Sequence, residues 1–354
     1  MGLFSTPILG LDIGASSIKL VEGQMLKSGK FQLSNFLSFD LPSGVVSEIG
    51  VEDPNSVSDQ LKNALIQLKK KKPLLSSGIK GPGVLTKRVS MPKVPVREIP
   101  QQVKWEAEQV FPADINSIFV THILLGEIEQ LPMAPPGTKG WDILLVGVRR
   151  DVAQAIYQIA EFSDSKLKIL DLEAFALMDF LGKALNISPE ETVAFVDVGA
   201  SATRVFVWNN AKTVFLREFS IGGNAFSDAI SSTLGLSFED AEALKIQDSS
   251  AIPEEAVSAL QGQMGNWKNE LQQCEDIYVT QSNNELIEKW CFFGGGFLTP
   301  GLKESLEDER FAGKVLVVGP GDIFQLKNNK INPEFFDYWG PRLLTGAALA
   351  ARRK

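Results

Sequence analysis

The sequence feature that most constrains the fold is a short motif that occurs twice. Residues 10–22 are typical of an apolar strand, a tight turn and a second strand, with an acid before the turn and a base after it. Residues 196–205 keep Asp, Gly, Ala and Ser in the same order and replace the lysine by arginine. Such a repeat, one copy in each half of the chain, predicts two similar half-molecules that face each other across a ligand.

The turn of each copy has the chemistry of a phosphate site. Backbone N–H groups of a Gly/Ser turn can converge on an anion, and Gly14 and Gly199 allow the close approach that a Cβ would block. Ser16 and Ser201 add hydroxyl donors, and Lys19 offers a positive charge to phosphate oxygens. The sequence therefore predicts that both turns contact phosphate.

Asp12 and Asp197 precede these turns and would repel a phosphate group directly. We interpret them as partners of a magnesium ion or of its waters, since hard cations prefer oxygen ligands. The alternative is a pair of ordinary hairpins whose Asp and Lys side chains are solvated. Two copies in register favour the phosphate site over that alternative.

Composition excludes several classes of function. The net charge of −8 argues against nucleic acid as the main partner, and two cysteines are too few for a disulfide framework or a zinc site. His122 is the only histidine, so Ser-His-Asp catalysis and histidine-rich metal sites have nothing else to build on. No apolar run is long enough to span a bilayer and no signal peptide is recognisable, so we expect a cytoplasmic protein without direct membrane insertion.

The length of 354 residues exceeds the usual size of one core and predicts two domains. A cluster of prolines marks an insert over about 90–165, predicted to have two or three strands of its own and Trp105 in its core. A helix over 57–72 is predicted to end in four lysines at the negative end of its dipole. A long helix over 254–279 is predicted to be irregular between Gly262 and Gly265.

The order of these elements resembles the actin-like ATP-binding superfamily, which includes actin, the heat-shock 70 chaperones, sugar kinases and the division protein FtsA. The resemblance implies a two-domain α/β fold of the ribonuclease H-like type that clamps ATP and Mg²⁺ between the matching hairpins. It implies a first domain (1A), an inserted 1C subdomain and a second domain (2A and 2B). Their predicted bounds are 1–89 with 166–192 and the C-terminal helix 341–354, then 90–165, then 193–340.

The resemblance also implies a role for each matching residue. Asp12 and Asp197 match the metal-associated acids, and Lys19 matches the phosphate-contacting base. The phosphate loops are implied to comprise Gly14, Ser16, Ser17, Gly199, Ser201 and Thr203. The remaining nucleotide-binding residues are implied to be Gly223, Asn224, Glu242, Lys245 and the adenosine turn Gly294, Gly295 and Gly296.

Two of these assignments have a plain structural alternative. Glu173 begins a helix where the superfamily places a residue that positions the attacking water, but an acid at a helix N-terminus is also favoured by the dipole alone. Glu242 and Lys245 would flank the ribose and adenine, or would form an exposed ion pair on one helix face.

Within the superfamily, the chain resembles the PilM family of type IV pilus assembly proteins. The hairpin at 11–22 carries this resemblance together with residues 105–109, 221–224 and 236–245. It implies a cytoplasmic ATP-Mg-binding adaptor that docks the N-terminal peptide of the inner-membrane protein PilN in a groove of the 1A and 1C subdomains. Through PilN it would be recruited to the inner membrane and coupled to pilus motor components.

FtsA shares the 1C insert, but it ends in a linker and a membrane-binding amphipathic helix. Residues 347–354 read instead as the last helix of the fold, so FtsA is disfavoured. Small-molecule kinases and filament-forming proteins are built on the same fold, and the sequence leaves both functions open. It does not decide whether ATP is hydrolysed, and at most slow turnover is expected.

Overall fold

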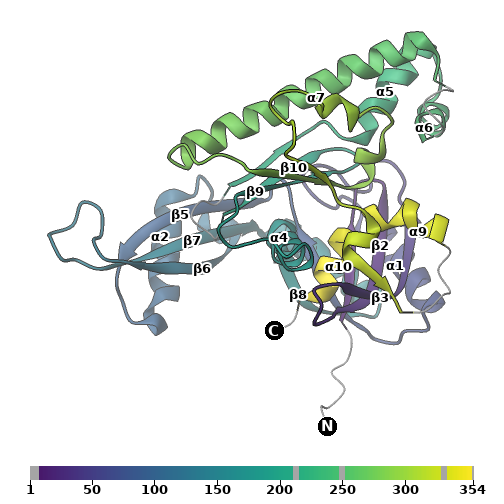
Figure 1. Ribbon diagram of the computed structural model, residues 1–354. Helices are drawn as coiled ribbons and strands as arrows, with labels where there is room; N and C mark the ends of the chain where they lie inside the picture. Colours follow the sequence, from purple (N-terminus) through teal and green to yellow (C-terminus); the bar gives the residue numbers. More distant parts are fainter. Residues whose placement is uncertain (1–7, 210–214, 247–251, 328–332, 353–354) are drawn as a thin grey trace.

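The core consists of two sheets that share the topology of five of their strands and are separated by a layer of two helices (Figure 1). The computed structural model describes residues 8–209, 215–246, 252–327 and 333–352. Its helices are α1 (Pro54–Gln67), α2 (Ile99–Val110), α3 (Arg150–Phe162), α4 (Glu173–Ala184), α5 (Gly223–Leu234), α6 (Phe238–Ile246), α7 (Glu254–Gln281), α8 (Pro320–Ile323), α9 (Pro333–Trp339) and α10 (Leu344–Ala351). In the part of the chain that the structure describes, none of these helices is long and apolar enough to cross a membrane.

The first sheet belongs mainly to the N-terminal half and has the order β14-β3-β2-β1-β4-β8. Its strands are β1 (Ile8–Ile13), β2 (Ser17–Met25), β3 (Phe31–Asp40), β4 (Leu74–Ile79), β8 (Lys166–Leu172) and β14 (Phe324–Leu326). β1, β2 and β3 form an antiparallel meander, whereas β4 is parallel to β1 and β8 is parallel to β4.

The second sheet repeats this arrangement with the order β11-β10-β9-β12-β13. Its strands are β9 (Val193–Val198), β10 (Thr203–Trp208), β11 (Phe215–Phe219), β12 (Lys289–Phe293) and β13 (Val315–Val317). β9, β10 and β11 again form an antiparallel meander, and β12 and β13 again add in parallel on the other side of β9. The repeat in the sequence is therefore part of a repeat of five strands, and β14 of the first sheet has no counterpart among the described strands of the second.

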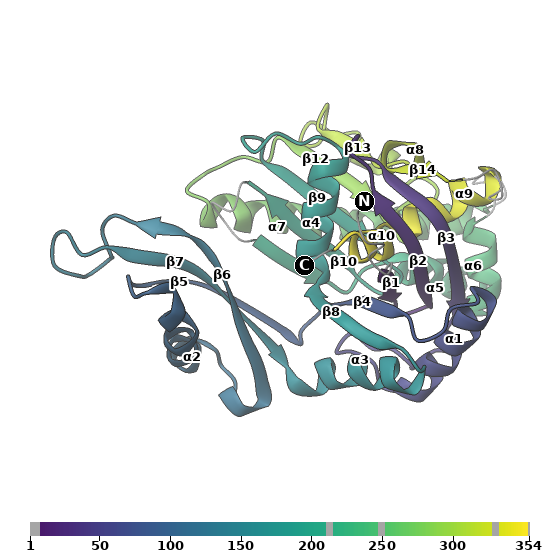
Figure 2. The same cartoon turned by 90° about the horizontal axis from the view of Figure 1, so that it is seen from below.

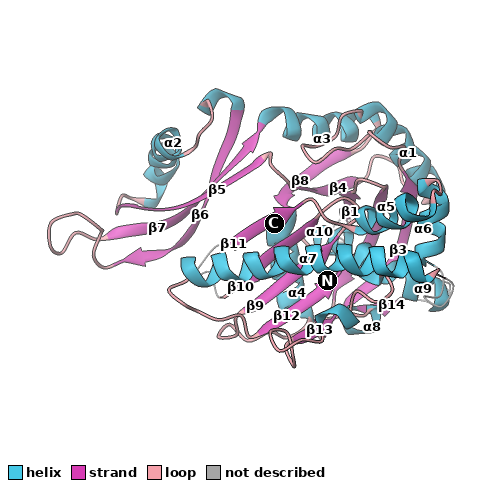
Figure 3. Ribbon diagram, turned by 90° about the horizontal axis from the view of Figure 1, so that it is seen from above, coloured by secondary structure: helices cyan, strands magenta, loops and turns pink. Residues whose placement is uncertain are grey.

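The alternation of side chains along each strand explains the layers. Leu9, Leu11 and Ile13 of β1 pack with α1 and α3, while Val21 of the same sheet packs with α4 and α10 on the other face. Figure 2 shows α1 and α3 lying side by side over the first sheet. In the second sheet, Phe195 faces the α4 and α10 layer and the opposite face is covered by α5 and α7, the long helix of Figure 3.

A third sheet, of order β5-β7-β6, extends away from this core with α2 on one of its faces (Figure 1). Its strands are β5 (Val84–Pro92), β6 (Ile118–Ile128) and β7 (Gly140–Arg149). The sequence placed an insert at 90–165, and residue 90 falls inside β5. The helix α3, at the other end of that range, packs on α1 of the core. The division into domains stays a prediction.

Three local predictions were wrong. The helix predicted over 57–72 is α1, which ends at Gln67, and Lys69 and Lys72 follow it with positive φ values of 53° and 45°, so the lysines do not complement its dipole. The helix α7 runs through both of its glycines as one 28-residue helix. Trp105, expected in the core of the insert, is 55% exposed on α2.

Candidate functional site

The two hairpin turns have the same backbone hydrogen bonds. The N–H of Gly14 donates to the carbonyl of Ser17 at 3.0 Å, and the N–H of Gly199 donates to the carbonyl of Ala202 at 2.9 Å. The strand registers agree as well, since Asp12 lies opposite Lys19 and Asp197 lies opposite Arg204. These two glycine amides are thus used within the turns.

The turns line one cleft with a volume of about 1120 Å³ between the halves, at the large end for a ligand site. Sixteen of the seventeen residues proposed from the sequence line it. They are Asp12, Gly14, Ser16, Ser17, Lys19, Glu173, Asp197, Gly199, Ser201, Gly223, Asn224, Glu242, Lys245, Gly294, Gly295 and Gly296.

Thr203 is the residue that the structure places elsewhere. Its side chain is fully buried, its hydroxyl donates to the carbonyl of Ile221 at 2.6 Å, and it accepts the indole N–H of Trp267 at 2.9 Å. Thr203 therefore ties the second hairpin to α7, and its side chain does not line the cleft. A threonine that begins a buried strand could have suggested this role.

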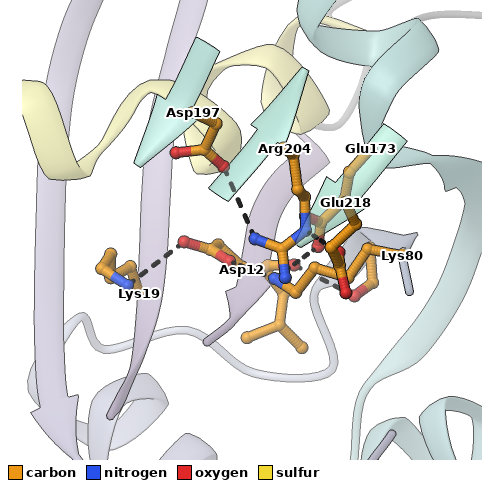
Figure 4. Close-up of polar contacts among 9 residues, drawn as sticks. Asp12, Lys19, Lys80, Glu173, Asp197, Arg204 and Glu218 are labelled. Atoms are coloured by element: carbon orange, nitrogen blue, oxygen red, sulfur yellow. Dashed lines mark hydrogen bonds and ion pairs between the residues drawn. The ribbon is translucent and has the colours of Figure 1, made fainter. Parts of the chain in front are cut away.

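In the first half, two lysines hold the acids of the cleft (Figure 4). Lys19 Nζ lies 3.2 Å from Asp12 Oδ2, and Lys80 Nζ lies 3.5 Å from Asp12 Oδ1 and 3.0 Å from Glu173 Oε1. Asp12 and Glu173 are buried, with exposures of 6% and 3%. Glu173 begins α4, as the sequence predicted, and its carboxylate is occupied by Lys80.

In the second half, Arg204 lies between two acids (Figure 4). Its Nη1 is 3.7 Å from Asp197 Oδ2, and its Nε is 2.6 Å from Glu218 Oε2. This second contact is a close ion pair between two buried atoms. A guanidinium carries five N–H donors, so contacts from Nε and Nη1 leave donor capacity of Arg204 unused.

Burial and charge act differently on the two hairpin acids. Burial alone would raise the pKa of Asp12, but the charges of Lys19 and Lys80 outweigh it and the pKa lies below its usual value. Burial raises the pKa of Asp197, and the charges of Arg204, Lys80 and Lys19 offset this only in part. Burial also raises the pKa of Glu173 despite its contact with Lys80.

The glycines of the second half allow three turns to pack closely. A Cβ on Gly294, whose φ is 96°, would lie 2.4 Å from the carbonyl oxygen of Val198. A Cβ on Gly296 would lie 2.5 Å from the carbonyl oxygen of Gly199. A Cβ on Gly295 would meet only the side chain of Arg342. Packing between turns thus explains two of these glycines, and Gly295 is the one whose missing side chain leaves space beside the cleft.

Near these turns, Lys245 is 5% exposed and holds three partners. Its Nζ donates to the carbonyl of Gly223 at 2.7 Å and to the hydroxyl of Ser227 at 2.8 Å, and lies 2.6 Å from the carboxylate of Glu242. Burial lowers the pKa of Lys245. Glu242 and Lys245 therefore do not form the exposed ion pair of the alternative interpretation, because Lys245 is buried. The Glu242 side chain lines the cleft and is 37% exposed.

The two hairpin acids could hold a magnesium ion only together with oxygen atoms of a bound ligand. Among the described residues, no group of three His, Cys, Asp or Glu side chains could hold a metal ion. Asp12 and Asp197 are two carboxylates on one cleft, and Mg²⁺ is commonly held by one or two carboxylates together with phosphate oxygens and waters. The residues are compatible with a metal that arrives with a phosphate.

Sequence reasoning missed Lys80, Arg204 and Glu218. For Arg204 the signal was present, because arginine replaces lysine at the same position of the repeat. Lys80 follows β4, which is parallel to β1, so its place beside Asp12 depends on a strand pairing that the sequence did not specify.

The comparisons with known proteins agree with this architecture. A family model described as "Type IV pilus assembly protein PilM" matches residues 10–354. A solved PilM-PilN type IV pilus biogenesis complex is similar over 97% of this chain and 97% of that chain, with 22% identity and a TM-score of 0.81. The ethanolamine utilization protein EutJ from Carboxydothermus hydrogenoformans is similar over 99% of this chain and 92% of its own, with 14% identity and a TM-score of 0.57. These likenesses confirm the predicted actin-like α/β fold.

Proposed function

Because the chain belongs to the family of type IV pilus assembly protein PilM, we propose that it is an ATP-binding adaptor of the pilus assembly complex. The observation that carries the nucleotide proposal is the single cleft into which both hairpin turns open. A ligand there can contact matching Gly/Ser turns and cations from both halves of the molecule. A fold alone would not support this, since related folds serve many functions.

Within the cleft, the chain's own residues have distinct tasks. When a nucleotide is bound, Lys19 would neutralise phosphate oxygens, and Asp12 and Asp197 would hold a magnesium ion. Glu242 would accept hydrogen bonds from hydroxyl groups of the nucleoside, while Lys245 holds the Glu242 carboxylate in place. Glu173 would orient the attacking water. Since Lys80 occupies the Glu173 carboxylate at 3.0 Å, we expect slow turnover, which fits an adaptor better than a kinase.

Titration with fluorescently labelled ATP in the presence of Mg²⁺ tests the nucleotide site. Asp12→Ala combined with Asp197→Ala should remove the part of the ATP affinity that depends on Mg²⁺, because the carboxylates of both hairpins are lost. The matched control is Asp59→Ala with Asp164→Ala, which removes two exposed acids from the surface and should bind as the wild type does. Unchanged affinity in the cleft double variant would refute a clamp built from the two hairpins.

We further propose that the third sheet receives the N-terminal cytoplasmic peptide of a PilN-type membrane protein, which would recruit the chain to the inner membrane. β6 forms an edge of this sheet, and Phe119, Ile123 and Leu124 on it are about 40% exposed. An edge strand with exposed apolar side chains suits the addition of an extended peptide. Pro92, Pro95, Pro100 and the α2 helix with Trp105 are a second candidate surface on the same module.

Binding of a labelled PilN N-terminal peptide from the same genome tests this proposal. Ile123→Glu should weaken binding at least about tenfold, because it puts a charge on the edge that the peptide would cover. Ile66→Glu is the matched control, since it adds the same charge at an apolar side chain that is 73% exposed on α1. If the peptide fails to bind in the presence of ATP and Mg²⁺, the adaptor assignment is wrong, and if Trp105→Ala alone abolishes binding, α2 is the docking surface.

A further inference from the structure

We propose that Arg204 and Lys80 are phosphate-binding residues, so that this chain binds nucleoside polyphosphates with little dependence on a divalent metal. The inference rests on the proposed nucleotide site and specifies how that site neutralises charge. Neither residue belongs to the turns from which the phosphate site was predicted.

Arg204 is the counterpart of Lys19 in the second hairpin. Each lies directly opposite the hairpin acid on the neighbouring strand, and each lines the same cleft. The two cations therefore approach the space between the turns from opposite halves. If a phosphate chain bound in this space contacts Lys19 on one side, the equivalent position of Arg204 lets it contact the same chain on the other side.

The contacts of Arg204 leave it able to accept a new anionic partner. Its Nη1 lies 3.7 Å from Asp197, which is longer than a hydrogen bond, and its Nε is paired with Glu218 at 2.6 Å, so these two contacts use only part of the five N–H donors of the guanidinium. A phosphate group offers the planar guanidinium two oxygens at once, which is the geometry that arginine binds best. A phosphate can thus satisfy donors that the acids of the cleft leave unused.

Lys80 supplies a third cation from outside both hairpins. It lies at the end of β4 between Asp12 and Glu173, and its side chain is 21% exposed on the cleft. The two carboxylates outweigh the effect of burial and raise the pKa of Lys80, so it is charged at neutral pH. A terminal phosphate oxygen can replace the more distant carboxylate, that of Asp12 at 3.5 Å, while Lys80 keeps its contact with Glu173.

The pairing of acids and cations in the cleft is the reason why we expect nucleotide binding to depend little on a metal. Each of the acids Asp12, Asp197, Glu173 and Glu218 already has a cation of the chain within 4 Å. A metal ion must compete with those cations for the carboxylates, whereas a polyphosphate can exchange carboxylates for its own oxygens at Lys19, Lys80 and Arg204. Three charge-assisted contacts can hold a phosphate chain before any metal is added.

The test is titration of the full chain with labelled ATP and ADP, in Mg²⁺ and in excess EDTA. We expect wild-type affinity to fall less than about tenfold in EDTA. Arg204→Gln and Lys80→Gln should each cost about tenfold or more in EDTA, as expected for loss of a charged hydrogen bond, and less in Mg²⁺. Arg204→Lys should recover part of the loss because it restores the charge without the fork. Unlabelled tripolyphosphate should compete with ATP in EDTA.

The control is Arg310→Gln. Like Arg204, Arg310 is paired with two acids, but these acids, Glu275 and Asp276, belong to α7 and not to the cleft. It should leave both affinities unchanged, and the thermal midpoints of all variants verify that they are folded. Binding in Mg²⁺ that disappears in EDTA, or EDTA affinities that the cleft variants do not change, would overturn this inference alone. Absence of nucleotide binding in both buffers would overturn the proposed nucleotide site itself.

Discussion

Among the described residues, Asp12 of the first hairpin has two cations within 4 Å, Lys19 at 3.2 Å and Lys80 at 3.5 Å, whereas Asp197 of the second hairpin has one, Arg204 at 3.7 Å. Both acids are buried and both lie at the same position of the repeat. Their pKa values nevertheless shift in opposite directions from the usual value of 3.8. The repeat has kept the backbone geometry of the two halves and has changed their electrostatics.

The origin of the difference lies at the neighbouring parallel strand. In the first sheet β4 leads into Lys80, which reaches Asp12. In the second sheet β12 occupies the same place beside β9, and the glycine turn at 294–296 follows it. The first half therefore has a charged side chain, Lys80, after this parallel strand, whereas the second half has glycines without side chains. If the proposed nucleotide site is correct, we expect the first half to contribute more to phosphate binding and the second half to leave room for the nucleoside.

The largest effect is expected at the acid with two cations. Asp12→Asn should lower the free energy of unfolding by about 3 kcal/mol, because it leaves Lys19 buried without a charged partner. The estimate lies at the low end for a broken buried pair, since Lys80 keeps its contact with Glu173. Chemical denaturation without nucleotide measures it. A stability equal to that of the wild type would mean that these lysines do not stabilise Asp12.

The next effect concerns a position where the two hairpins differ in packing. Ile18 of the first hairpin and Thr203 of the second occupy equivalent places, and both are buried. Thr203→Val should cost about 2 kcal/mol, because the indole N–H of Trp267 loses its acceptor. Denaturant titration measures this loss, and ATP affinity should not change. A large drop in ATP affinity with an unchanged free energy of unfolding would mean that Thr203 contacts phosphate after all.

The smallest effect has the opposite sign. Asp197→Asn should raise the free energy of unfolding by about 1 kcal/mol at neutral pH, because burial disfavours the charged form of this acid. Arg204 keeps Glu218 as a partner in this variant. The same substitution should weaken Mg²⁺-dependent ATP binding, so stability and binding would change in opposite directions.

The pH dependence of these two variants sharpens the contrast. A raised folded pKa means that the contribution of Asp197 is fully present below 3.8 and is lost as the pH rises through its folded pKa. The advantage of Asp197→Asn should therefore vanish toward acid pH. Asp12 behaves in reverse, since its contribution is present above 3.8 and is lost as the pH falls through its lowered folded pKa. Parallel curves for the two variants would contradict this assignment.

Much of the site could be predicted because it is local. A turn of Gly and Ser between two apolar strands specifies its own backbone, and two copies specify that the halves match. The prediction of a helix that begins at Glu173 was confirmed for the same reason. The prediction that Thr203 belongs to the phosphate loop was wrong, because its hydroxyl accepts the indole N–H of Trp267, a residue of α7 far along the chain.

The sequence by itself contained the repeat, and it predicted the α/β class and sixteen of the residues that line the cleft. Only the tertiary structure decided which charges neutralise which, because Lys80 reaches Asp12 through the parallel pairing of β4 with β1. It also decided that Gly294 and Gly296 serve the packing of neighbouring turns, since the atoms nearest to their added Cβ would be backbone oxygens at the end of β9 and in the turn after it. Spacing along the chain reports local backbone geometry, whereas burial and the distance between charges depend on contacts between distant segments.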